Sequence, residues 1–346
     1  MKEVRKTKLL NALSREATKP PPVWLMRQAG RYLPEYRAVR GRAGSFWTMC
    51  MTPELAAEVT LQPIARYDFD AAIIFSDILT VPYALGCEVS FEDGTGPRLE
   101  VVDSVDRLVQ DGVRWAEKLA PCYDALGLVR QSLGNNRSLI GFAGAPWTLA
   151  TYMAEGAGST DQRAAKLWGY RDPQAFGRLL DLLGDCISQH LIAQIDAGAD
   201  TVQLFDSWAA GLADIPFRDW VIAPTKRVVE KVKRSCPDAK IIGFPRGATL
   251  QGYVDYARAT GVDAVSLDTA VPLQWAVENL SPLAVMQGNL DPIALIAGAA
   301  ALFSAADRIM ASTQGIPFVF NLGHGILPET PVEHVDALVK RIRRTS

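Results

Sequence analysis

Eight short apolar runs recur along the chain, and each is followed by a polar or glycine-rich turn and a longer amphipathic segment. The runs cover residues 23–26, 71–75, 138–142, 201–205, 240–244, 263–267, 283–287 and 317–321. They are rich in β-branched and aromatic residues and show no polar alternation, which is typical of parallel strands covered on both faces. Eight strands alternating with helices in 346 residues predict an α/β fold, a closed (β/α)₈ barrel of the TIM type.

Helix boundary signals agree with this alternation. Residues 52–54, Thr-Pro-Glu, combine a capping residue, a proline at the first helical position and an acid in the first turn. The Asp-Pro pairs at 172–173 and 291–292 repeat this pattern. Gly198 and Gly261 each stand shortly before a strand, where helix C-caps belong. No G-x-G-x-x-G follows the first run, which counts against a dinucleotide-binding sheet.

We expect one domain over residues 1–346. The length beyond the roughly 250 residues of a typical barrel falls in two segments. One is an N-terminal arm, residues 1–21. The other is Cys87–Val102, in which two stretches of period-2 alternation flank a glycine-rich turn and predict a β-hairpin insertion.

Composition narrows the possible functions. The chain is 49% hydrophobic and 21% charged with a formal net charge of −2, so it lacks the basic surface of a general nucleic-acid binder. The N-terminus has no secretory pattern, and the stretch 292–306 is too short to span a membrane, so we expect a cytoplasmic protein. The five cysteines are widely spaced and predict neither a disulfide framework nor a zinc site.

The most distinctive stretch, residues 22–42, changes abruptly from apolar to cationic. Glu35 is the only acid among its five arginines, which are Arg27, Arg31, Arg37, Arg40 and Arg42. Arginine pairs with carboxylate or phosphate through two parallel hydrogen bonds, and Gly30 lets a ligand approach the backbone. The stretch therefore indicates a site for a ligand with several anionic groups. A solvated helical face remains the alternative.

Polar residues follow the predicted strands, at the end of a barrel where active sites lie. Asp77 follows a strongly apolar run and needs donors or a cation to stay charged there, although a structural ion pair would also explain it. His324 stands between two glycines. Tyr152 fits a pocket hydroxyl or a core aromatic residue, and Ser207 fits a ligand donor or a helix N-cap. No metal-ligand spacing, P-loop or G-x-S-x-G is present.

Six blocks in this sequence closely resemble the uroporphyrinogen decarboxylase family, bacterial type. They are MRQAGRYLPEYR at 26–37, FSDIL at 75–79, GFAGAPWTLATYM at 141–153, FDSWAAGL at 205–212, QGNLDP at 287–292 and NLGHGILPETP at 321–331. The resemblance implies a barrel enzyme of haem and tetrapyrrole biosynthesis, a lyase that converts the four acetate arms of uroporphyrinogen III to methyl groups. The expected products are coproporphyrinogen III and four CO₂. The resemblance also implies catalysis without metal or organic cofactor, and a cytoplasmic homodimer.

The resemblance assigns substrate contacts to Arg27, Gln28, Ala29, Gly30, Arg31, Arg40, Phe46, Asp77, Tyr152, Ser207 and His324. Of these, Asp77 is expected to accept the pyrrole N–H groups and stabilise a cationic intermediate, and Arg27 is the favoured site of proton delivery. A guanidinium is a poor acid, so Arg27 could instead position a water or hold the leaving carboxylate. Residues Gly243–Arg246 depart from the resemblance, because the family more often has a turn with a small residue and Lys or Gly there.

Two alternatives have different requirements. A corrinoid-dependent methyltransferase of the same superfamily would need a His-x-Cys zinc motif, but His324 is followed by Gly325 and Ile326. A non-catalytic tetrapyrrole-binding protein would also need arginines around an apolar cup, yet it has less use for a buried Asp77.

Overall fold

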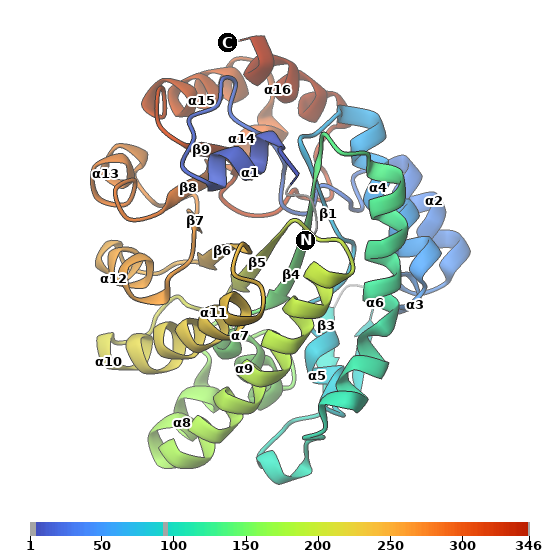
Figure 1. Ribbon diagram of the computed structural model, residues 1–346, viewed down its shortest axis with the longest axis vertical. Coiled ribbons are helices and arrows are strands. Elements are labelled where there is room, and N and C mark those ends of the chain that lie inside the picture. Colours follow the sequence, from blue (N-terminus) through green and yellow to red (C-terminus); the bar gives the residue numbers. More distant parts are fainter. Residues whose placement is uncertain (1–4, 93–95, 345–346) are drawn as a thin grey trace.

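The structure, a computed structural model, describes residues 5–92 and 96–344. Its main sheet contains seven parallel strands that curl around a common interior, and Figure 1 shows them following one another along an arc. In spatial order they are β1 (Ala71–Ile73), β4 (Ser138–Gly144), β5 (Thr201–Asp206), β6 (Lys240–Pro245), β7 (Ala264–Ser266), β8 (Val285–Leu290) and β9 (Phe318–Leu322). Seven of the eight predicted runs thus form strands, and the predicted α/β barrel fold class is confirmed.

The first predicted strand, 23–26, is wrong as a regular strand. It makes a single parallel bridge, between Val23 and Phe320 of β9. Prolines precede it and supply no N–H donor, and the Val23 N–H donates to the Asp70 side chain at 2.9 Å. The segment nevertheless lies between β9 and β1, because Phe320 donates to Pro22 O at 2.9 Å and Asp70 donates to Val23 O at 3.0 Å. It fills the position of the eighth strand without a full ladder.

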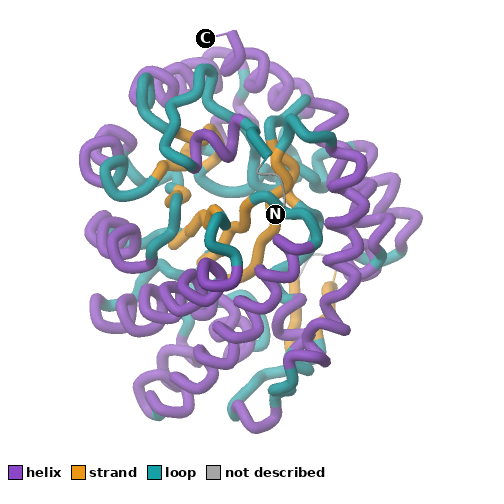
Figure 2. Tube along the Cα trace, in the orientation of Figure 1, coloured by secondary structure: helices purple, strands orange, loops and turns teal. Residues whose placement is uncertain are grey.

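Helices surround the strands (Figure 2). The longer ones are α4 (Pro53–Tyr67), α6 (Gly112–Leu133), α9 (Pro173–Asp196), α11 (Ala223–Ser235), α12 (Leu250–Thr260), α15 (Ala299–Ser312) and α16 (Val332–Arg344). Shorter ones are α2 (Pro34–Ala43), α3 (Phe46–Met51), α5 (Thr80–Ala84), α7 (Pro146–Glu155), α8 (Arg163–Arg171), α10 (Asp214–Pro216), α13 (Leu273–Asn279) and α14 (Pro292–Ala297). A 3₁₀ turn covers Val105–Arg107, and a π-helical turn covers Phe217–Ile222.

The predicted helix starts are confirmed at all three sites. The helices α4, α9 and α14 begin at their prolines, and Asp172 and Asp291 accept backbone N–H bonds at 2.9 and 2.8 Å. Gly261 is the left-handed C-cap of α12. Gly198 lies one residue beyond the C-cap of α9, and its φ of 122° is one that glycine adopts without strain.

Two hydrophobic clusters hold the barrel together. The outer cluster packs residues such as Val202 and Leu204 of β5 against the helices. The inner cluster lies within the ring of strands and includes Ile140, Ile242 and Val319. Successive residues of each strand therefore face opposite apolar layers, which is why the runs are uniformly apolar rather than alternating.

Helix α1 (Lys8–Leu13), from the N-terminal arm, closes the amino-terminal end of the barrel. Leu9 and Leu13 are buried and belong to the inner cluster. The hydroxyl groups of Thr7 and Ser138, at the start of β4, lie 2.5 Å apart, and Arg15 donates to Leu283 O just before β8. The arm thus contacts the starts of strands that are far apart in the sequence.

The predicted hairpin is confirmed in its strands. The strands β2 (Val89–Glu92) and β3 (Gly96–Leu99) pair in antiparallel register between β1 and β4 in the sequence. Residues 93–95 of the predicted turn lie outside the described residues. The end of β3 is anchored to α7, because Leu99 donates to Gly156 O at 2.8 Å and Val102 to Met153 O at 2.8 Å. The hairpin therefore extends one wall beyond the carboxyl ends of the strands.

The burial of α1 at the amino-terminal end of the barrel gives a prediction about stability. Leu9→Ala removes a fully buried side chain, so we expect it to lower the free energy of unfolding by roughly 2–5 kcal/mol in urea titrations. Leu128→Ala is the matched control, because that leucine is 36% exposed and should change stability by less than about 1 kcal/mol. Equal effects of the two substitutions would contradict the burial of α1.

Candidate functional site

A cavity of about 560 Å³ opens at the carboxyl ends of the strands, within the usual range for small-molecule sites. Its walls come from the turn after residue 26, the segment after β1, helix α7, the hairpin, the loops after β5 and β6, and residues 324–328. Elements from the whole length of the chain therefore meet at one site, as in a barrel whose loops carry its function.

Three phenylalanines form the apolar floor of the cavity. Phe142, Phe205 and Phe244 lie on the neighbouring strands β4, β5 and β6 and point into the barrel. The rings of Phe142 and Phe205 are 5.6 Å apart, and those of Phe205 and Phe244 are 6.2 Å apart, both edge to face. Such pairs fix ring orientations, so the floor is a contiguous aromatic surface.

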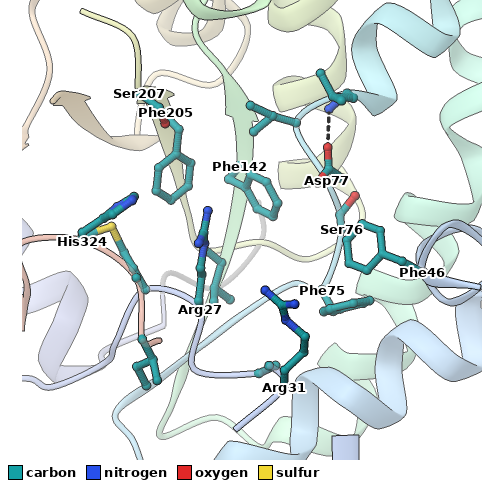
Figure 3. Close-up of a pocket in the computed structure, with 18 of the residues that line it drawn as sticks. Arg27, Arg31, Phe46, Phe75, Ser76, Asp77, Phe142, Phe205, Ser207 and His324 are labelled. Carbon is teal, nitrogen blue, oxygen red and sulfur yellow. Dashed lines mark hydrogen bonds between the residues drawn. The ribbon is translucent and has the colours of Figure 1, made fainter. Parts of the chain in front are cut away.

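Arg27 and Arg31 enter the cavity from the turn that follows residue 26 (Figure 3). Arg27 has a φ of 60°, in the left-handed region that non-glycine residues rarely adopt. Gln28 donates to Leu25 O and Leu33 donates to Gly30 O, both at 3.0 Å, so two backbone bonds define the turn. Such a conformation persists where its surroundings fix it, and it directs both guanidinium groups to one side.

Glycine at position 325 makes room for the Arg27 side chain. A Cβ atom added to Gly325 would overlap Cδ of Arg27 and would lie 2.6 Å from its Cγ. The φ of Gly325 is not positive, so space rather than backbone conformation requires glycine here. The stem of Arg27 therefore rests on the backbone of the segment that carries His324.

Asp77 is the one carboxylate among the described residues that line the cavity. Its Oδ1 accepts the Leu79 N–H at 2.8 Å, the dashed line in Figure 3. Burial raises the pKa of Asp77 to about 6, while the Leu79 hydrogen bond and the charge of Arg27 act in the opposite direction. The group is thus largely ionised at pH 7, and its second oxygen is available to a donor in the cavity.

Arg27 lies between Asp77 and His324 (Figure 3). Burial lowers the pKa of the Arg27 guanidinium, and the nearby Asp77 charge opposes this effect. Burial also lowers the pKa of His324 to about 4, and the charges of Arg27 and Arg246 lower it further. His324 is therefore neutral at pH 7 and offers hydrogen bonds rather than a proton.

Tyr152 of α7 and Ser207, which follows β5, both line the cavity. Buried hydrogen bonds connect these two elements. The Thr148 hydroxyl of α7 donates to Asp206 Oδ1 at 2.5 Å and accepts the Trp208 N–H at 3.1 Å. The ring of Trp208 also packs edge to face on Tyr152. Ser207 thus belongs to the cavity wall, and burial raises the pKa of the Tyr152 phenol, which keeps it protonated.

The structure brings together nine of the eleven residues predicted to contact substrate. The nine that line the cavity are Arg27, Ala29, Gly30, Arg31, Phe46, Asp77, Tyr152, Ser207 and His324. The Gln28 side chain is instead buried, accepting from Leu25 N at 3.1 Å and donating to Ala71 O at 3.1 Å, so it shapes the turn. Arg40, on α2, does not line the cavity and acts electrostatically on Tyr36, which does.

Several lining residues were missed by the sequence reasoning. Phe91 and Pro97 reach the cavity from the hairpin, and Phe91 lies 4.8 Å from the ring of Phe46. No local signal could have placed them there, because their position depends on how the insertion folds back. The aromatic floor could have been predicted from the sequence, because three successive strands each have a phenylalanine near the carboxyl end.

Charge and shape together define a class of site. Among the described residues, three guanidinium groups and one carboxylate line the cavity, which leaves an excess of two positive charges over an aromatic floor. A barrel with this cavity is suited to a flat or cupped apolar ligand that carries several carboxylates around its edge.

Comparisons with known proteins agree with this class. The family model described as "Uroporphyrinogen decarboxylase (URO-D)" matches residues 5–345, so the chain belongs to the uroporphyrinogen decarboxylase family. A uroporphyrinogen decarboxylase from Sinorhizobium fredii is 50% identical over 100% of this chain and 99% of its own length. One from Chelativorans sp. is 49% identical over 97% of this chain and 98% of its own length.

A solved methyltransferase from Methanosarcina mazei shares the fold, with a TM-score of 0.82, 18% identity and 99% coverage of both chains. At this identity the likeness concerns the fold alone. Within residues 5–92 and 96–344, no group of three or more histidine, cysteine or acidic side chains is arranged to hold a metal ion. None of the helices described there is long and apolar enough to cross a bilayer.

The contact between Gly325 and Arg27 gives a prediction. Gly325→Ala should displace the Arg27 side chain and lower decarboxylase turnover at least about tenfold, equivalent to roughly 1.4 kcal/mol in the barrier. The measurement is steady-state kinetics together with a thermal melt. Gly127→Ala in α6 is the control, because its added Cβ meets nothing within 4 Å. Wild-type turnover in a folded Gly325→Ala variant would show that Arg27 tolerates displacement.

Proposed function

We propose that this chain is an enzyme that removes CO₂ stepwise from the four acetate arms of uroporphyrinogen III, giving coproporphyrinogen III. One observation carries the proposal above the others: Asp77 and the two arginines Arg27 and Arg31 line one aromatic-floored cavity. Membership of the family and relatives of about 50% identity over the full length support the same activity.

The substrate's charges match the cavity. Uroporphyrinogen carries eight carboxylates on its rim and four pyrrole N–H donors at its centre. The rim needs cations, which Arg27 and Arg31 supply as planar forks, and the centre needs an acceptor. Asp77 offers its free oxygen to the N–H groups, and several such bonds stabilise its ionised form despite burial.

Decarboxylation needs somewhere for an electron pair to go. A proton added to the pyrrole carbon beside the acetate-bearing carbon makes the ring cationic. The bond between the arm's CH₂ and its carboxylate then breaks, CO₂ leaves, and the pair forms an exocyclic double bond that neutralises the ring. A proton added to that CH₂ and the loss of the ring proton give the methyl group. Each cycle consumes one proton.

Asp77 lowers the barrier because its charge interacts more strongly with the cationic ring than with the neutral substrate. Such differential stabilisation acts on turnover rather than only on binding. The Leu79 N–H fixes the carboxylate before substrate arrives, so little reorganisation accompanies the reaction.

Arg27 is the group we assign to proton delivery. It lies between Asp77 and His324 in the cavity, and Asp77 and Arg27 act on each other electrostatically. His324, neutral at pH 7, is assigned a hydrogen bond to a peripheral carboxylate. The remaining predicted contacts, including Gln28 and Arg40, stay predictions about the bound state.

We also propose a cytoplasmic homodimer that works without metal or organic cofactor, as the family resemblance implies. Sedimentation of the purified protein tests the dimer, and elemental analysis combined with activity after chelation tests the cofactor.

The activity itself is tested by anaerobic incubation of purified protein with uroporphyrinogen. Chromatography should show hepta-, hexa- and pentacarboxylate intermediates before the tetracarboxylate product. Unchanged octacarboxylate after prolonged incubation with folded protein would overturn the proposed function.

Replacing Asp77 tests its role. Asp77→Asn keeps the acceptor for Leu79 but removes the charge, so we expect turnover to fall at least about a thousandfold, roughly 4 kcal/mol, with an unchanged thermal melt. The control is Asp219→Asn, an exposed acid that does not line the cavity. Near-normal turnover in the folded Asp77→Asn variant would exclude the electrostatic role.

The raised pKa of Asp77 predicts a pH profile. Below a pH of about 6 the free enzyme's Asp77 becomes neutral, so kcat/KM should fall about tenfold per pH unit. Pyrrole N–H donors lower this pKa in the complex, so the break in kcat should lie at lower pH than that in kcat/KM. Initial rates between about pH 5 and 8 measure both profiles, and the Asp77→Asn variant reports the titration of the substrate itself.

A further inference from the structure

Arg246 is a third guanidinium group in the cavity, a further cation for the rim carboxylates to which the proposed chemistry assigns no particular carboxylate. It follows β6, where its backbone N–H donates to Asp206 O at 3.1 Å and Phe244 O at 3.0 Å. The next residue, Gly247, donates to Asp268 Oδ2 at 2.7 Å. The base of the side chain is thus held firmly while its head faces the cavity.

Among the described residues, no carboxylate forms an ion pair with Arg246. The nearby acid, Asp268, has both oxygens engaged: Oδ2 accepts from Gly247 and from the Tyr253 hydroxyl at 2.9 Å, and Oδ1 accepts from Ala270 at 2.8 Å. A half-buried guanidinium in such surroundings fits an anionic group of the ligand.

Arg246 lines the same cavity as Arg27, Asp77 and His324, and it follows β6 while His324 follows β9. Its charge lowers the pKa values of His324 and Arg27. The groups that act on the pKa of Asp77 are instead Leu79 and Arg27. The charge of Arg246 thus acts on Arg27 and His324, whereas Arg27 is the guanidinium whose charge acts on Asp77.

The substrate has an anion at the matching place. Each pyrrole ring of uroporphyrinogen carries one acetate and one propionate on adjacent carbons. When the acetate of a ring reacts at Arg27 while Asp77 binds the central N–H groups, the nearest other anion is the propionate of that same ring. We propose that Arg246 binds this propionate, an inference that rests on the proposed function.

Recognition of a propionate persists through the later steps of the reaction. Propionates are not consumed, so Arg246 meets an equivalent carboxylate at each of the three rings that share one order of acetate and propionate in the III isomer. It is a specificity-determining residue that recognises the part of each ring that does not change.

The test replaces Arg246 and compares substrates that differ in their acetates. Arg246→Gln should raise KM about tenfold for both uroporphyrinogen and the pentacarboxylate, with kcat reduced much less. The product coproporphyrinogen, which has propionates only, should inhibit this variant about tenfold more weakly. Arg246→Lys, which keeps the charge but not the fork, should recover part of the loss. Arg258→Gln, on the exposed face of α12, is the control for removing one charge.

The failures of the two proposals are distinguishable. Wild-type protein that does not decarboxylate uroporphyrinogen contradicts the proposed function. Normal wild-type turnover with unchanged KM and product inhibition in folded Arg246→Gln protein contradicts only the role of Arg246. A KM effect that is large for uroporphyrinogen but absent for the pentacarboxylate and the product assigns Arg246 to an acetate and overturns the propionate assignment.

Discussion

An uncompensated positive charge inside a largely apolar cup is the constraint on which the site depends. Arginine suits this position because its guanidinium stays charged where a lysine would tend to lose its proton. The single carboxylate among the described lining residues, Asp77, is held between two opposing effects, since burial favours its neutral form while Arg27 and the Leu79 N–H favour its ionised form. A ligand that brings both anions and N–H donors satisfies every group at once, whereas water satisfies them only in part.

Most of the barrel could be predicted from sequence because parallel strands between two apolar layers appear in the sequence as short, uniformly apolar runs. The runs that became β4, β5 and β6 are uniformly apolar since one side faces helices and the other faces the interior. Residues 23–26 form an equally apolar run but make only one isolated β-bridge and no regular strand. Their backbone partners are set by the preceding prolines and by the Asp70 side chain, 47 residues away in the chain. Composition of a short run does not contain that information.

The position of polar residues after strands was a good guide to the lining of the cavity, because a barrel gathers these positions at one end. Asp77, Ser207 and His324 were found in this way. The position of a residue after a strand does not predict the direction in which its side chain points. The Gln28 side chain points into the protein and donates to Ala71 O, while the neighbouring Arg27 side chain lines the cavity. The need for glycine at position 325 likewise depends on a contact between residues that lie at opposite ends of the chain.

Helix α1 fills the amino-terminal end of the barrel, and the described cavity opens at the carboxyl ends of the strands. A ligand in this cavity therefore enters and leaves on the side of the hairpin and the strand-end loops. In the proposed reaction, each new acetate arm must reach Arg27 at this end of the barrel, where Phe91 and Pro97 of the hairpin form part of the wall. Successive rounds of the proposed reaction therefore need the intermediate to be turned relative to Arg27, within the cavity or after release.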